Sequence, residues 1–190
     1  MADLPILEFA DEQAWEAWLE ENHPKSSGIW LKIARKEAST PSVSYQEALG
    51  VALCFGWIDG QKNKFDENYW LQKFTPRRAK SGWSKINRQK AESLIAGGKM
   101  REAGLKEVER ARQDGRWEAA YDSQSSASVP DDLQKALDAN PAAQAFFDTL
   151  NSVNRYAILY RVSTAKKAET RQKRIEQFVA VLNEGRKIYE

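Results

Sequence analysis

Hydrophobic and polar positions follow two different periods in the first third of the chain. The stretch "SGIWLKIARKE" alternates, with Ile29, Leu31 and Ile33 on one side, and this period of two predicts a β-strand. A shorter strand is predicted at "PILEF". Between them, "DEQAWEAWLEENH" predicts a helix, because its apolar residues share one helical face: Ala14, Trp15, Trp18 and Leu19.

The stretch "SYQEALGVALCFGW" predicts a buried helix. Ser44 is a suitable N-cap, and Glu47 stands three residues later, as a capping box requires. The residues that follow are apolar on most sides, which is typical of a helix surrounded by other elements.

The region after this helix predicts a hairpin and two more helices. "IDGQKNKFDENYWLQKFTPRR" reads as two strands around a turn. The candidates for the inner face of these strands are Phe65, Tyr69, Leu71 and Phe74. Helices are predicted near Ser84–Ala96 and Met100–Gln113, ended by Gly97-Gly98 and by Gly115.

A Ser-rich stretch, "YDSQSSASVPDD", then indicates a flexible connection. Everything after it has a helical pattern, including a proline-capped start at Asn140-Pro141. We therefore predict the α+β class: a small mixed or antiparallel sheet with helices, followed by a C-terminal helical region. The predicted ranges are an α+β domain over residues 1–121, a linker over 122–130 and helices over 131–190.

Composition excludes several classes of protein. The chain has 190 residues, is 42% hydrophobic and carries a formal charge of +2, which is ordinary for a soluble globular protein. Cys54 is the only cysteine and lies in an apolar run, so we expect a buried, inert thiol and no disulfide. No stretch reaches the ~20 apolar residues of a membrane helix. The opening residues lack the features of a signal peptide, which favours a cytoplasmic location.

Candidate catalytic groups are few. His23 is the only histidine, so one chain cannot build a Cys/His zinc cluster, and no Walker or dinucleotide glycine motif is present. Asp59 in "GWIDG" lies between two glycines and fits either a ligand contact or a simple turn. We identify no catalytic constellation and predict no cofactor and no metal.

The stretch Thr75–Lys90, "TPRRAKSGWSKINRQK", contains six basic residues and no acidic one. Arginines beside the start of a helix are typical of an anion site. We expect this stretch to meet Trp57–Gly60 in a cleft for a small anion or an acidic peptide. The candidates are Arg77 and Arg78 for charge, Trp57 or Trp83 for stacking, and Asp59 and Asn87 for orientation. A solvated surface with a structural arginine and a nucleic-acid site are the alternatives.

A second basic cluster runs from Arg155 to Arg174, where seven basic residues accompany one acidic residue, Glu169. The pattern allows a helix-turn-helix with a basic second helix, and nucleic-acid binding is the alternative function. The candidate residues are Lys166, Lys167, Arg171 and Arg174. A solvated basic face on an amphipathic helix explains the same pattern. No protein partner can be inferred.

Several motifs together resemble one known family. "SYQEALGVALCFGWIDG", "YWLQKFTPRRAKSGWSKIN", "DGRWEAAY" and "AKKAETRQKRI" are similar to the YdeI/OmpD-associated family, also called bacteriocin-protection proteins. The resemblance implies an α+β region followed by helices. It also implies an association with tolerance of bacteriocins or cationic antimicrobial peptides and, in name, with an outer-membrane porin. It supplies no catalytic residues.

Overall fold

The computed structural model describes residues 4–38 and 40–190. The chain divides into two compact units. The N-terminal unit runs to Trp83 and continues over Asn87–Glu118, and the C-terminal unit comprises Ser84–Ile86 and Ala119–Glu190. The domain and linker ranges expected from composition stay a prediction.

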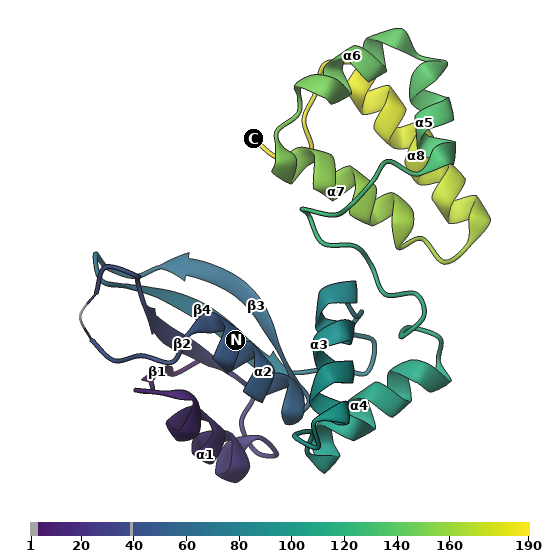
Figure 1. Cartoon of the computed structure of the whole chain (residues 1–190). Helices are drawn as coiled ribbons and strands as arrows, with labels where there is room; N and C mark the ends of the chain where they lie inside the picture. Colours follow the sequence, from purple (N-terminus) through teal and green to yellow (C-terminus); the bar gives the residue numbers. More distant parts are fainter. Residues whose placement is uncertain (1–3, 39) are drawn as a thin grey trace. The chain divides into compact units, whose positions relative to one another are not determined.

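The N-terminal unit combines a four-stranded sheet with helices (Figure 1). Its elements are, in order, β1 (Ile6–Glu8), α1 (Glu12–Asn22), β2 (Ile29–Ala34), α2 (Tyr45–Cys54), β3 (Trp57–Lys64), β4 (Tyr69–Pro76), α3 (Lys85–Ala96) and α4 (Glu102–Gln113). The sheet order is β1-β2-β4-β3, with β1 parallel to β2 and the other pairs antiparallel. The sheet is therefore mixed, and the predicted α+β class is confirmed.

Local capping places the first two helices. The side chain of Asp11 accepts a hydrogen bond from the Ala14 amide at the start of α1. At α2, the Ser44 hydroxyl accepts from the Glu47 amide, and the Glu47 carboxylate accepts from the Ser44 amide. The predicted capping box is thus present in both directions.

The aromatic core lies between the sheet and helices α1 and α2. Trp15 of α1 is fully buried and donates its indole N–H to the carbonyl of Ala48 in α2 at 3.1 Å. Its ring stacks on Trp18 at 5.4 Å and meets Trp57 and Phe74 of the sheet at 6.4 and 5.8 Å. These contacts fix which face of the sheet the helices cover.

The predicted inner face of the hairpin was partly wrong. Phe74 pairs with Ile29 and lies on the helix-covered face, but Tyr69 and Leu71 pair with Ala34 and Lys32 on the opposite face. Side chains alternate along a strand, so positions 69 and 71 cannot share a face with position 74. Tyr69 and Leu71 are still buried, and the Lys32 ammonium lies 3.8 Å from the ring centroid of Tyr69. Phe65 lies in the turn and is 47% exposed.

Helix α4 packs closely against the C-terminal end of α2. A Cβ atom at Gly104 would lie 2.4 Å from the carbonyl oxygen of Cys54 and 2.6 Å from that of Leu53. Gly56, which ends α2, has a positive φ of 72° and faces the carbonyl of Ala103. Only glycine fits these two positions without a shift of the backbone.

The C-terminal unit is helical, with α5 (Asp131–Asp138), α6 (Pro141–Thr149), α7 (Ser152–Ser163) and α8 (Ala168–Asn183). Its core contains Leu133, Leu137, Phe147, Ile158 and Leu182, each at most 1% exposed. On α8, Ile175, Phe178, Val179 and Leu182 are buried in this core, whereas Ala168 is exposed.

One buried amide connects this core to the C-terminal residues. Asn154 in α7 is 2% exposed. Its side-chain oxygen accepts from the amides of Ile188 and Tyr189, and its side-chain nitrogen donates to the carbonyl of Tyr189. Within residues 4–38 and 40–190, no helix has the length and apolar character needed to cross a membrane.

Candidate functional site

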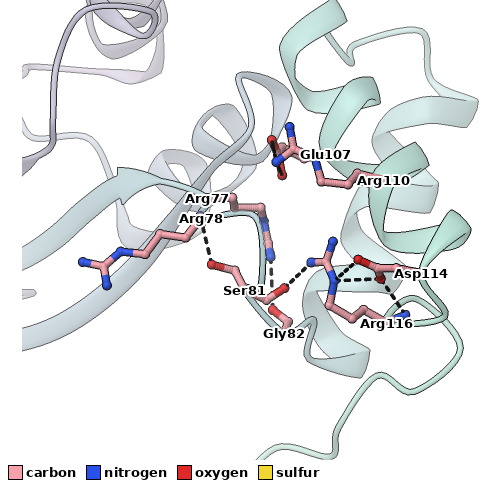
Figure 2. A network of polar contacts seen from close by, with 8 residues as sticks. All are labelled: Arg77, Arg78, Ser81, Gly82, Glu107, Arg110, Asp114 and Arg116. Carbon is pink, nitrogen blue, oxygen red and sulfur yellow. Dashed lines mark hydrogen bonds and ion pairs between the residues drawn. The ribbon is translucent and has the colours of Figure 1, made fainter.

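Arg77 follows β4 directly and closes the loop that leads to α3. It is 6% exposed, and its guanidinium carbon lies 3.4 Å from the ring centroid of Trp83. Its Nη1 atom donates to the carbonyl of Gly82 at 3.1 Å (Figure 2). Arg77 therefore stabilises the loop, which is the role that the alternative of a structural arginine predicts for this stretch.

Arg116 supports the same loop from the end of α4. It is 8% exposed, pairs with Asp114 at 2.7 Å and donates to the carbonyl of Ser81 at 2.5 Å (Figure 2). Arg116 lies in the motif "DGRWEAAY", from which no role was predicted. A buried guanidinium beside Asp and Trp could have been suspected from that motif, but its partner Ser81 is remote in sequence.

Arg78 and the two candidate tryptophans have different environments. Arg78 is exposed and points away from Arg77, while its amide donates to the Ser81 hydroxyl (Figure 2). Trp57 and Trp83 are each 1% exposed. Trp57 packs edge-on against Trp15 and Trp18, and Trp83 packs against Trp117. Both therefore have a packing role, and the stacking predicted for them lacks an exposed ring face.

Asp59 and Asn87, the two residues expected to orient a ligand, lie together. The side-chain nitrogen of Asn87 lies 3.5 Å from one oxygen of Asp59, and the Tyr45 hydroxyl donates to the other at 2.9 Å. Burial and the Asp59 carboxylate raise the pKa of Tyr45, so its hydroxyl stays protonated and remains a donor. The two stretches that carry Asp59 and Asn87 thus meet within the N-terminal unit.

A basic pocket lies further along the same face of the sheet. Its volume is about 370 Å³, and it is lined by Arg35, Lys62, Asn63, Lys64 and Trp70. The ammonium of Lys62 lies 4.0 Å from the ring centroid of Trp70, and Lys64 pairs directly with Trp70 across the hairpin. None of the lining residues is acidic. We call these five residues the basic pocket.

The cluster of Tyr45, Asp59 and Asn87 and the basic pocket form one continuous strip. Tyr45, which bonds Asp59, also packs on Trp70 with ring centroids 6.1 Å apart. At one end of the strip lie the carboxylate of Asp59 and the amide of Asn87. At the other end, the three basic side chains of the basic pocket lie around the indole ring of Trp70. Such a set of groups can bind and orient an anionic ligand.

The basic pocket was not predicted from the sequence. The period of two in "KNK" places Lys62 and Lys64 on one face of a strand, and this signal was available. Arg35 could not be added, because its place depends on the order of the strands. Its amide donates to the carbonyl of Asn68 and its Nε to that of Asp66, which ties the end of β2 to the hairpin turn.

The Cys54 thiol and the possible metal ligands offer little support for a catalytic or metal site. Cys54 is 5% exposed, and burial raises the pKa of its thiol to about 11, as expected for an inert buried cysteine. In the part of the chain that the structure describes, no group of three His, Cys, Asp or Glu side chains could hold a metal ion.

The four basic residues proposed for nucleic acid divide into two pairs. Arg171 binds Asp132 through two hydrogen bonds and donates to the carbonyl of Val162. Arg174 donates to the carbonyl of Arg161. Lys166 and Lys167, between α7 and α8, are exposed. Half of this predicted site is thus engaged in contacts within the C-terminal unit.

Comparisons with known proteins divide the chain in a similar place. A family model described as a domain of unknown function (DUF8412) matches residues 7–107, more than half of the chain, and the protein belongs to this family. A second model, described as bacteriocin-protection, YdeI or OmpD-associated, matches residues 126–185. The predicted resemblance is thereby confirmed over the C-terminal helices. The motifs "SYQEALGVALCFGWIDG" and "YWLQKFTPRRAKSGWSKIN" fall within the first model, and "DGRWEAAY" lies between the two matches. Searches of curated proteins and of solved structures found no match.

Proposed function

We propose that the protein is a binding protein that recognises an acidic ligand, a small anion or an acidic peptide, through the basic pocket of its N-terminal unit. The observation that carries this proposal is the arrangement of Arg35, Lys62 and Lys64 around Trp70. Among the described residues, none of these three cations forms an ion pair with a carboxylate, so their charge is available to a ligand.

Asp59 and Asn87 extend the proposed site. A carboxylate and an amide beside the cations favour an acidic ligand that carries a hydrogen-bond donor at the end nearest Asp59. Arg77 contributes indirectly, since it fixes the loop that precedes Asn87. We propose no ligand contact for Trp57 or Trp83, and the role of Arg78 depends on its exposed charge.

The physiological role proposed for this binding is bacteriocin protection or a related stress tolerance. It is supported by the match of the C-terminal helices to the bacteriocin-protection model. A cytoplasmic location is part of the same proposal, and a single buried thiol is compatible with it.

Thermal unfolding with a panel of ligands tests the binding proposal. The panel contains inorganic phosphate, a Glu-rich peptide, a Lys-rich peptide and an oligonucleotide. The proteins compared are the natural chain, the pocket variant Arg35→Gln/Lys62→Gln/Lys64→Gln and the control Lys166→Gln/Lys167→Gln. A ligand present at a hundred times its Kd adds about 2.7 kcal/mol of stability, which is easily measured.

Phosphate or the acidic peptide should stabilise the natural chain and the control but not the pocket variant. Equal stabilisation of the pocket variant would overturn the proposal. A response to the oligonucleotide that disappears in the Lys166→Gln/Lys167→Gln protein would favour the alternative, nucleic-acid binding by the C-terminal helices. Bacteriocin tolerance of cells that carry each variant then tests the physiological role.

A further inference from the structure

The edge of the sheet beside the basic pocket is open. β3 is the last strand in the order β1-β2-β4-β3, and within the described residues only β4 pairs with it. Its second half, Gly60–Lys64, is exposed throughout. An edge strand of this kind presents a row of backbone donors and acceptors that another extended chain can pair with.

This edge is held in a fixed shape. Gln72 of β4 is 4% exposed and donates to the carbonyls of Gly60 and Gln61, at the irregularity where β3 changes its register with β4. At the other end, the Asp66 carboxylate accepts from the amides of Asn68 and Tyr69 and fixes the hairpin turn. A partner strand would therefore meet a preorganised edge, which reduces the entropy cost of binding.

The charges on the edge select its partner. Lys62 and Lys64 stand at alternate positions of β3 and project toward the Trp70 side of the sheet. Residues directly opposite each other on neighbouring strands approach closely, so a pairing strand places its own alternate side chains beside these lysines. Acidic side chains at every second position complement this pattern.

The same charges disfavour a second copy of the chain. If two β3 edges paired with each other, the lysines of one copy would lie against the lysines of the other, and like charges directly opposite are destabilising. Lysines on an edge strand commonly prevent such self-association. The edge therefore rejects its own copy and remains available to a strand of opposite charge.

The geometry points to β-strand addition: we infer that an extended acidic peptide segment pairs with the free edge of β3, and that its alternate Asp or Glu side chains bind Lys62 and Lys64. This inference rests on the proposed function and names, within it, an acidic peptide rather than a small anion as the ligand. The peptide backbone supplies hydrogen bonds along Gly60–Lys64, and its side chains supply the charge.

Two peptides of identical charge test the inference. The first alternates Glu with Thr, and the second has the same sequence with methyl groups on alternate backbone nitrogens, which removes the donors needed for strand pairing. Binding to the full chain is measured by calorimetry, and hydrogen exchange of the β3 amides is measured by NMR. Inorganic phosphate is included as a probe of the basic pocket alone.

The unmodified peptide should bind, slow the exchange of amides in Gly60–Lys64 and exceed the affinity of the methylated peptide by about tenfold or more. Lys62→Gln/Lys64→Gln should weaken binding, whereas Lys25→Gln/Lys106→Gln, a matched change of charge elsewhere in the N-terminal unit, should not. Equal binding of the two peptides without protection of β3 would overturn strand addition while leaving the proposed function intact. If neither peptide nor phosphate binds, both the inference and the proposed function fail.

Discussion

The guanidinium of Arg77 stacks on the indole ring of Trp83, with 3.4 Å between the guanidinium carbon and the ring centroid. Trp83 in turn contacts Trp117 at 4.8 Å, so the loop after β4 is fastened to the end of α4 by a cation and two aromatic rings. The side chain of adjacent Arg78 is exposed. The two arginines thus form a natural pair for comparing a structural with a solvated guanidinium.

Replacing Arg77 with Ala should lower the free energy of unfolding by about 2–4 kcal/mol, because the carbonyl of Gly82 and the face of Trp83 lose a buried charged partner. Arg78→Ala should stay within about 0.5 kcal/mol of the natural chain. Urea unfolding of the two variants measures both values. Similar losses in the two proteins would contradict the structural role of Arg77.

Two glycines inside helices should respond to alanine in opposite directions. Gly104→Ala should destabilise the fold by about 1–3 kcal/mol, because the added methyl group would press on the carbonyl of Cys54. At Gly50, the added Cβ would lie 3.6 Å from the Cε of Lys90, which is an ordinary contact distance. Gly50→Ala should therefore gain up to about 1 kcal/mol from helix propensity. Thermal unfolding of both variants tests the sign of each effect.

The thiol of Cys54 should react slowly with iodoacetamide. Burial raises its pKa to about 11, so at pH 8 its thiolate fraction is about a hundredfold below that of an ordinary cysteine. Because the folded pKa lies above the unfolded one, this residue favours the folded state most at neutral pH and loses that contribution as pH rises toward 11. Mass spectrometry measures the rate of Cys54 alkylation in native buffer and in urea. Equal rates in the folded and unfolded chain would contradict the protection of the thiol by burial.

The C-terminal unit should depend on the pair formed by Arg171 and Asp132. Arg171→Gln should cost about 1–2 kcal/mol, whereas Lys173→Gln, an exposed neighbour on the same helix, should be nearly neutral. The hydrogen bonds from Arg171 lower the pKa of Asp132 below its usual 3.8. The pair therefore contributes fully above that value, and its contribution is lost as pH falls through the lowered pKa. Urea unfolding at several acidic pH values measures this effect. The difference in free energy of unfolding between the natural chain and Arg171→Gln should become smaller as the pH falls.

Local patterns predicted much of the fold. The capping box of Ser44 and Glu47, the alternation in β2 and the glycine ends of α3 and α4 depend on neighbouring residues alone, and the structure contains all of them. The predicted inner face of the hairpin was wrong at Phe65, which lies in the turn, and at Tyr69 and Leu71, because only pairing with β2 reveals which face the helices cover.

The candidate site was harder to predict for the same reason. Asp59 and Asn87 could be expected to meet because they lie at the ends of neighbouring elements, and they do lie together. The burial of Arg77 depends on a tryptophan ring and a loop carbonyl that no sequence pattern specifies. The basic pocket needs the position of Arg35 at the end of β2, beside a hairpin that follows it by some thirty residues.

The arrangement of the seven tryptophans gives the protein a built-in optical probe. Five are grouped in two clusters where close rings exchange excitation energy: buried Trp15 and Trp57 with half-buried Trp18, and buried Trp83 with buried Trp117. The other two, Trp30 and Trp70, are half-buried, and each lies beneath a lysine ammonium. Displacement of Lys62 from the Trp70 ring by an acidic ligand would change the fluorescence of that indole. The fluorescence of the clustered rings would not change. Light emitted by the protein therefore reports directly on the basic pocket, without any added label.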